Sequence, residues 1–310
     1  MRTGVLTCLL AGLCSLVGTT STFNYTKTEH VARHYEQTWF APAQEKRRCG
    51  ALLRTLAGDD LRIAFKIGLS IDEAMRATKC LDRYSYIYGP DMLPVGASGA
   101  VLSGPSVDTV GPYLFLHIAS FQIAAQDLVG VIGKIDPKTS EDIDTVVIDI
   151  RGNAGGYIDT LHELLDRWFA PRAGVRYLKL EGEATFGKYR TTSRTGLFSG
   201  RNIRILTDSD TGSSSEWLIE TLCYEWYPDK CTTLGSKTVG KSLLQCINRS
   251  EVTTKLTCGE WLLPPKSNKD QSRLAQRVQG VGIEPDLPLN FDCERYAYGC
   301  IALQLAEAGL

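Results

Sequence analysis

A serine-rich segment and a lysine further along the chain supply the residue types that a nucleophile and its base require. Residues 208–216 read Asp-Ser-Asp-Thr-Gly-Ser-Ser-Ser-Glu, and Lys241 directly follows the segment 235–240. Burial disfavours the ammonium form and lowers the pKa of a lysine, so a partly buried amine can accept the proton of a serine hydroxyl. The hydroxyls could instead only cap a helix, because Ser213 and Glu216 have the spacing of a capping box. Both interpretations predict a helix directly after the serines.

A glycine-rich turn, residues 152–156, is the second segment that could hold a reacting group. Glycine lets the backbone approach a ligand closely, and N–H groups at the start of a helix favour negative charge. The turn matches neither the dinucleotide pattern G-x-G-x-x-G nor a phosphate loop that ends in Gly-Lys-Ser. A plain tight turn explains these glycines equally well. None of the four histidines has a motif around it, so a histidine-based triad is not indicated.

The segments around these turns predict an α/β protein with a largely parallel sheet, because strand, turn and helix recur in that order. The sites of such folds lie at the carboxyl ends of the strands. The region before them, 27–88, has the apolar spacing of helices, and Ser70 is expected to cap one of them. The expected strands are 113–118, 145–150 and 202–207, and the expected helices are 124–135, 158–168 and 217–222.

Four segments resemble, in the same order, the motifs of the C-terminal processing, or tail-specific, serine protease family. Residues 147–156 resemble the pattern hhhDLRxNxGG, and residues 211–216 resemble (T/S)ASASE. Residues 238–245 resemble TxGKGxxQ, and residues 280–286 resemble GxGIxPD. The resemblance implies a crotonase/ClpP-like α/β core of the tail-specific protease type with a small N-terminal helical domain. Weaker matches are 81–85 to LDxHS and 111–121 to GYIxxxSF.

The resemblance also implies a role for each residue that matches a family motif. Ser213 would attack the scissile carbonyl, Lys241 would take its proton, and Gln245 would orient the lysine amine. Backbone N–H groups would hold the oxyanion, and the matching positions are Ser214 with Gly155 or Gly156. The family requires no metal and no cofactor for this chemistry.

The chain also departs from the family pattern. Three serines stand in a row, so Ser214 and Ser215 are alternative nucleophiles, and Lys237 is a rival base outside the T-x-G-K frame. Ser242 replaces the glycine that usually follows the lysine. Family members usually carry a PDZ domain before the core, but fewer than thirty residues lie between positions 85 and 113, too few for a domain. Recognition of C-terminal tails therefore does not follow from the resemblance.

The cysteines and the first residues predict export. Residues 1–22 have one basic residue, an uncharged run of about 14 residues and then small and hydroxyl residues, the pattern of a signal peptide. Eight cysteines remain after it, an even number that predicts disulfides. The spacing C-x-x-C does not occur, so the sequence gives no support for a zinc site. Sequence alone leaves 105 pairings open. Grouping along the chain favours Cys49–Cys80, Cys223–Cys231, Cys246–Cys258 and Cys293–Cys300. Asn24 and Asn248 lie in glycosylation sequons.

Composition limits the remaining function classes. With 34 basic and 35 acidic residues, the chain has no basic excess for nucleic acid or for strong membrane association. The expected domains are a signal peptide, a helical domain, an α/β catalytic domain and a helical tail: 1–22, 23–92, 93–292 and 293–310. The favoured function is an exported, periplasmic or secreted serine endopeptidase that acts on peptides or unfolded proteins. The alternatives are an inactive binding protein for apolar ligands or peptides on the same scaffold and an ester hydrolase. The oligomeric state is not readable.

Overall fold

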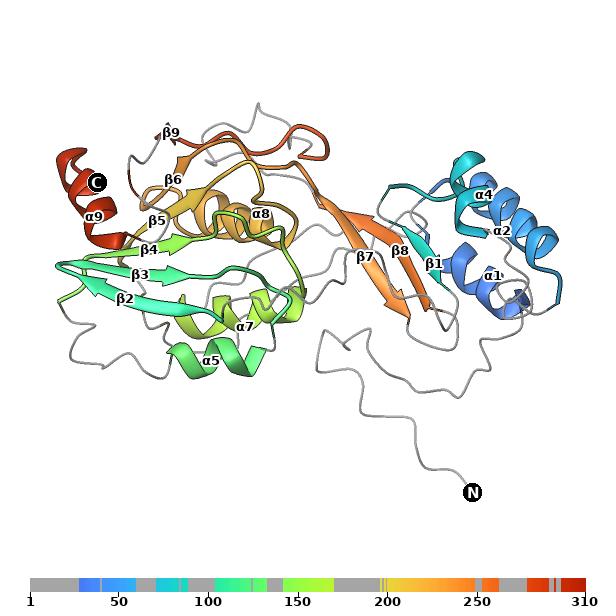
Figure 1. Ribbon diagram of the computed structural model, residues 1–310, viewed down its shortest axis with the longest axis horizontal. Coiled ribbons are helices and arrows are strands. Elements are labelled where there is room, and N and C mark those ends of the chain that lie inside the picture. Colours follow the sequence, from blue (N-terminus) through green and yellow to red (C-terminus); the bar gives the residue numbers. More distant parts are fainter. Residues whose placement is uncertain are drawn as a thin grey trace, which may run out of the picture. The chain divides into compact units, whose positions relative to one another are not determined.

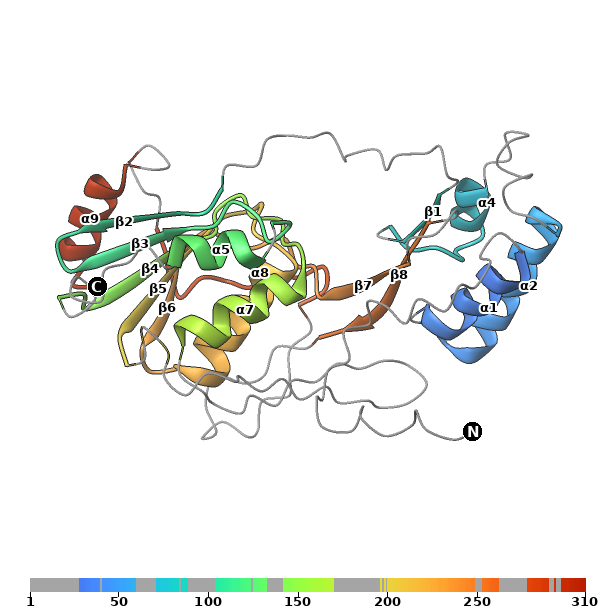
Figure 2. The same ribbon diagram turned by 90° about the horizontal axis from the view of Figure 1, so that it is seen from below.

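The computed structural model divides into two compact units, here called the helical unit and the core unit (Figure 1 and Figure 2). The predicted signal peptide, the Asn24 sequon and the predicted helix cap at Ser70 lie outside the residues that the structure describes. Those residues are 28–39, 41–59, 71–83, 85–88, 104–123, 125–132, 142–169, 196, 198, 200–248, 253–261, 278–289, 293 and 297–310.

The helical unit contains the described residues of 28–88 together with Leu243–Trp261. Its described helices are α1 (Thr28–Thr38), α2 (Ala43–Ala57) and α4 (Ile71–Ala77). Its antiparallel sheet has the order β1-β8-β7, with bounds Tyr86–Tyr88, Thr253–Glu260 and Leu243–Asn248. Tyr35, Leu53, Met75 and Leu256 share one apolar core, so the helices are packed on residues of β8. The helical character predicted for this region is confirmed.

The position of β7 and β8 differs from the expected domain boundaries. The sequence interpretation assigns residues 93–292 to one catalytic domain, but β8 pairs with β1, with Tyr86 opposite Lys255. This pairing groups Leu243–Trp261 with the N-terminal helices. A long-range strand pairing has no local sequence signal, which is why the boundary was not predictable from composition or spacing.

The core unit is built on a six-stranded sheet of order β2-β3-β4-β5-β6-β9. Only the β2–β3 pair is antiparallel, so the predicted, largely parallel α/β sheet is confirmed. All five residues of β4 are buried, as its continuous β-branched sequence predicts. The bounds are β2 Ser106–Val110, β3 Tyr113–His117, β4 Thr145–Asp149, β5 Asn202–Thr207, β6 Cys231–Gly235 and β9 Leu287–Pro288.

Helices cover this sheet and connect its strands. The helices are α5 (Ala125–Ile132), α7 (Ile158–Trp168), α8 (Ser214–Ile219) and α9 (Tyr298–Glu307), and α5 and α7 lie side by side in Figure 1. The helix α8 continues as a π-helix over Glu220–Trp226. The C-terminal α9 packs Tyr298, Ile301 and Leu305 onto one face of the sheet, where the Phe115 ring stacks on Tyr298 at 4.6 Å between centroids.

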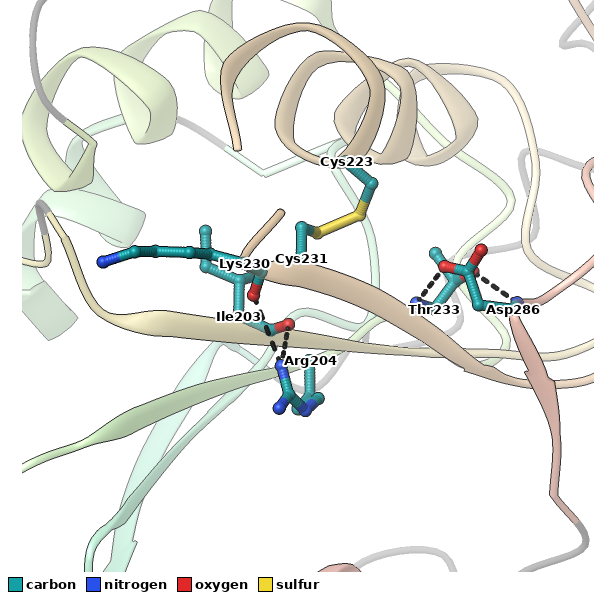
Figure 3. The surroundings of a disulfide bond; sticks show 7 residues. All are labelled: Ile203, Arg204, Cys223, Lys230, Cys231, Thr233 and Asp286. Carbon is teal, nitrogen blue, oxygen red and sulfur yellow. Dashed lines mark hydrogen bonds between the residues drawn. A yellow bond between two sulfur atoms is a disulfide. The ribbon is translucent and has the colours of Figure 1, made fainter. Parts of the chain in front are cut away.

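Four disulfides join the eight cysteines in the pairs favoured by their grouping: Cys49–Cys80, Cys223–Cys231, Cys246–Cys258 and Cys293–Cys300. Figure 3 shows that Cys223–Cys231 links the π-helix after α8 to the start of β6. This bridge ties the helix that begins beside Ser213 to the sheet beneath it. In the part of the chain that the structure describes, no helix is long and apolar enough to cross a membrane.

Candidate active site

Ser213 lies in the turn between β5 and α8 in an unusual backbone conformation, with φ of 60° and ψ of −122°. Among the described residues other than glycine, only Lys79 also has a positive φ. Such backbone costs roughly 1–3 kcal/mol per residue and persists where the surrounding structure holds it. A strained turn from a strand into a helix exposes its hydroxyl, which is the geometry of a nucleophile elbow.

Burial distinguishes the three consecutive serines. Ser213 is half-buried, whereas Ser214 and Ser215 are only 3% and 0% exposed. Within the described part of the chain, the hydroxyls of Ser214 and Ser215 have no hydrogen-bond partner. Buried hydroxyls below the surface of α8 cannot reach a substrate, so the geometry favours Ser213 over the two alternative nucleophiles.

Glu216 connects the serine turn to the lysine segment. Its side chain is fully buried, and Oε2 accepts hydrogen bonds from the backbone N–H groups of Ser213 at 2.9 Å and of Lys241 at 2.8 Å. Oε1 accepts from the Gly240 N–H at 2.7 Å and from the Thr238 hydroxyl. The capping box predicted for Ser213 and Glu216 is present. One carboxylate therefore holds the backbone of Ser213 and Lys241 in a fixed mutual position.

The fourth motif supports the lysine segment from its other side. Thr238 N–H donates to Ile283 O at 3.1 Å, and Ile283 N–H donates to Thr238 Oγ1 at 2.8 Å. Gly280 N–H donates to Gly240 O at 2.8 Å. Asp286, at the end of the same motif, accepts from the N–H and the hydroxyl of Thr233 in β6, both at 2.9 Å (Figure 3). The motif thus joins the lysine segment to the sheet.

The glycine turn is bonded to the serine turn. Gly212 N–H donates to Asn153 O at 2.9 Å, and the Thr211 hydroxyl donates to Ile150 O at 3.0 Å. Gly152 N–H donates to Asp208 Oδ1 at 2.8 Å. Residues of all four motifs recognised in the sequence therefore meet in one hydrogen-bonded assembly within the core unit, to which the third motif contributes residues 238–242.

Gly155 lies directly against Ser213. A Cβ built on Gly155 would be 2.6 Å from Ser213 Cβ and 3.0 Å from Ser214 N, and its φ of 99° also favours glycine. A Cβ on Gly156 would meet the Phe121 backbone at 2.1 Å. Both glycines are therefore required sterically, which a plain tight turn would not demand.

The N–H groups near Ser213 differ in their availability for an oxyanion. Gly155 N–H donates to Asn153 Oδ1 at 2.9 Å, while Gly155 O accepts from Phe121 N–H at 3.1 Å. The Gly156 N–H points away from that carbonyl because the peptide is trans. Ser214 is the first residue of α8, where an N–H has no partner inside the helix. Of the two glycines left open by the resemblance, the geometry favours Gly156.

The remaining predicted residues are Lys237 and Gln245. Lys237 Nζ forms an ion pair with Glu284 at 2.6 Å, and the two side chains are 45% and 70% exposed. The Lys237 amine is thus exposed and paired with a carboxylate, whereas Lys241 is half-buried and its backbone is bonded to the same carboxylate as Ser213. Gln245 lies in β7 of the helical unit and donates from Nε2 to Leu243 O at 3.1 Å. Its role toward Lys241 stays a prediction.

Several supporting residues were not identified from the sequence as part of the site. The sequence indicates only that Asp208 follows a strand. In the structure its carboxylate also accepts hydrogen bonds from the Asp210 N–H at 3.0 Å and from the Thr211 hydroxyl at 3.1 Å. Asn153 is fully buried and donates from Nδ2 to Ile118 O at 2.9 Å. Side-chain acceptors that bind distant backbone groups leave no periodic signal. Among the described residues, no group of three or more His, Cys, Asp or Glu could hold a metal ion.

Comparison with known proteins agrees with the fold and the motifs. The model of peptidase family S41 matches residues 113–289, and the chain belongs to this family. The matched range contains the glycine turn, the serine turn and the lysine segment. The predicted resemblance to the tail-specific protease family is thereby confirmed.

Individual relatives are distant. The carboxy-terminal processing protease CtpB of Bacillus subtilis (strain 168) is 25% identical over 221 residues, which are 68% of this chain and 43% of that protein. The chain therefore spans less than half the length of this relative. A lipoprotein of Streptococcus agalactiae has a TM-score of 0.59 at 15% identity, over 92% of this chain and 96% of its own, a likeness of fold alone. The photosystem II D1 C-terminal processing protease has a TM-score of 0.47 at 14% identity, over 71% and 51%.

Proposed function

We propose that this protein is an exported serine endopeptidase in which Ser213 is the nucleophile and Lys241 the general base. The observation that carries the proposal is the buried carboxylate of Glu216, which accepts the backbone N–H of both residues. A carboxylate that only capped a helix would bind Ser213 without also binding Lys241, which follows Glu216 by 25 residues. The strained φ of Ser213 supports the same assignment.

The chemistry is acyl transfer through a covalent intermediate. The neutral amine of Lys241 takes the proton of Ser213 Oγ while this oxygen forms a bond to the scissile carbonyl carbon. The resulting oxyanion accepts hydrogen bonds from the N–H groups of Gly156 and Ser214. The C–N bond then breaks, and the Lys241 ammonium returns its proton to the leaving amine. The same amine then takes a proton from water while the water oxygen bonds to the acyl carbon; the bond from this carbon to Ser213 Oγ breaks, and the Lys241 ammonium returns the proton to Oγ. Gln245 orients the amine throughout.

The disulfides support export. All eight cysteines that follow the predicted signal peptide are paired, and disulfides persist mainly in oxidising compartments outside the cytoplasm. The substrate is a peptide or an unfolded protein segment that reaches the half-buried Ser213.

The test compares wild type with Ser213→Ala and Lys241→Ala in cleavage of casein and of a peptide library. The matched controls are Ser209→Ala, an exposed serine of the same turn, and Lys237→Ala, the exposed lysine of the same segment. We expect a loss of at least 10³-fold for the first pair and wild-type rates for the controls. Full activity of either member of the first pair would overturn the assignment.

A fluorophosphonate probe separates this proposal from the alternative of a binding protein. We expect labelling of Ser213, found by mass spectrometry of the digested protein, and no labelling of Ser213→Ala. An unlabelled wild type that also binds apolar ligands tightly would favour the inactive scaffold.

A further inference from the structure

Large apolar side chains are exposed at only a few described positions of the core unit. Three of these positions adjoin the backbone of the glycine turn or of the lysine segment. Tyr157 follows Gly156, Val239 precedes Gly240, and Val281 lies in the turn bonded to Gly240. Single exposed apolar residues are ordinary, but their concentration around one site is not. The exposed positions are Tyr157 (47%), Val239 (43%), Val281 (55%), Leu287 (40%) and Leu303 (67%).

Val239 faces outward between two residues that face inward. Thr238 and Gly240 are buried and bonded to Glu216, whereas Val239 is 43% exposed. Its N–H donates to Thr211 O at 2.9 Å, so its backbone is held on the serine turn. The direction of the Val239 side chain is therefore set by hydrogen bonds on both sides.

The Val239 side chain packs on the residue before the nucleophile. A Cβ built on Gly212 would lie 3.2 Å from Val239 Cβ and 3.3 Å from Cγ2. These distances are tighter than ordinary van der Waals contact, so an alanine at position 212 would push Val239 outward. The absence of a side chain at Gly212 thus leaves Val239 seated beside Ser213.

Val281 extends the same surface. A Cβ built on Gly240 would lie 2.9 Å from Val281 N, and Gly280 N–H donates to Gly240 O. The tight turn, closed by Val281 N–H to Val278 O at 2.9 Å, holds the half-exposed valine next to the lysine segment. Val239 thus lies beside the serine turn and Val281 beside the lysine segment, both on hydrogen-bonded backbone and both about half exposed.

We infer that Val239, with Val281 beside it, forms the apolar wall of a substrate subsite next to Ser213. The subsite takes a branched aliphatic side chain that flanks the scissile bond. Covering the valines with such a side chain removes apolar surface from water, which is favourable, whereas a charged side chain would lose hydration there. This inference rests on the proposed endopeptidase activity and adds the class of substrate residue.

The experiment measures kcat/KM on peptides that differ in one residue beside the scissile bond, either Val or Leu against Gly or Asp. Variants are Val239→Thr, which keeps the shape but adds a hydroxyl, Val239→Ala, and Gly212→Ala, which displaces Val239. Leu303→Ala is the control, because this exposed leucine lies on α9. The preference ratio is kcat/KM on the Val or Leu peptides divided by kcat/KM on the Gly or Asp peptides. We expect this ratio to fall roughly tenfold in both Val239 variants and to stay unchanged in Leu303→Ala. Gly212→Ala should lower the ratio as well.

Thermal unfolding and the rate of fluorophosphonate labelling show whether each variant is folded with a reactive Ser213. An active Val239→Thr with the wild-type ratio would overturn the subsite while leaving the endopeptidase proposal intact, as would a wild type without aliphatic preference. If wild type is neither labelled nor active on any peptide, the endopeptidase proposal fails and the subsite fails with it.

Discussion

Lys241 is bonded through its backbone N–H to the buried carboxylate of Glu216 at 2.8 Å, across 25 residues of sequence. The same oxygen accepts the N–H of Ser213, so a single side chain sets the distance between two segments that chain connectivity leaves independent. Four donors converge on this carboxylate, which lies where water cannot replace it. Its removal therefore affects both stability and chemistry.

We predict that Glu216→Ala lowers the free energy of unfolding by roughly 3 kcal/mol or more, because each buried donor left without an acceptor costs roughly 1–3 kcal/mol. Glu216→Gln keeps one oxygen acceptor and should lose less stability. It should still lose most activity, because the NH2 group of the glutamine would face a hydrogen-bond donor and displace the backbone that the carboxylate holds. Urea unfolding and peptide cleavage measure the two effects. The exposed Glu284→Gln is the control and should leave stability unchanged; an active Glu216→Ala would contradict the role of this carboxylate.

The carboxylate of Asp208 joins the glycine turn to the serine turn. We predict that Asp208→Ala lowers kcat by about 10–100-fold with little change in KM, since small displacements of reacting groups carry such penalties. Asp208→Asn keeps an oxygen acceptor for the Gly152 and Asp210 N–H groups and should retain most of kcat. The exposed neighbour Asp210→Ala is the control. Equal activity of the Ala and Asn variants would count against the connection.

Gly155 packs against Ser213 without room for a methyl group. We predict that Gly155→Ala loses at least 10²-fold in kcat, because the new Cβ displaces either Ser213 or the oxyanion turn. Circular dichroism and fluorophosphonate labelling distinguish a misplaced serine from an unfolded chain. Gly104→Ala, at a position where a Cβ meets nothing within 4 Å, should behave as wild type. A fully active Gly155→Ala would show that the turn is not tightly fitted.

The helical unit has a pH-dependent element in His34. Burial lowers the pKa of His34 below its usual 6.5, because the charged ring is poorly hydrated there. The unfolded chain therefore binds the proton more readily than the folded chain. The free energy of unfolding falls as the pH drops below about 6.5 toward the folded pKa of His34, and His34 does not lower it at pH values above about 6.5. We predict that His34→Gln reduces the loss of stability between pH 8 and pH 5, measured by urea unfolding. An identical loss in both proteins would contradict this.

Local patterns in the sequence predicted much of this structure. The continuous β-branched run at 145–150 indicates a strand buried on both faces, and the apolar spacing at 158–168 indicates a helix with one buried face, so β4 and α7 were predictable. The grouping of eight cysteines favoured the four pairs that occur, because all are close in sequence. The four motifs in order predicted the family to which the chain belongs.

By itself, the sequence determined the strands β3, β4 and β5, most helices, the family and the candidate residues Ser213 and Lys241, because residue type and spacing carry that information locally. Only the tertiary structure decided that β7 and β8 belong with the N-terminal helices, that Ser214 and Ser215 are buried, and that Glu216 holds the two candidate segments together. Strand pairing, burial and hydrogen bonds to distant backbone depend on which segments meet in space. That meeting is the outcome of packing the whole chain and is not a property of any one segment.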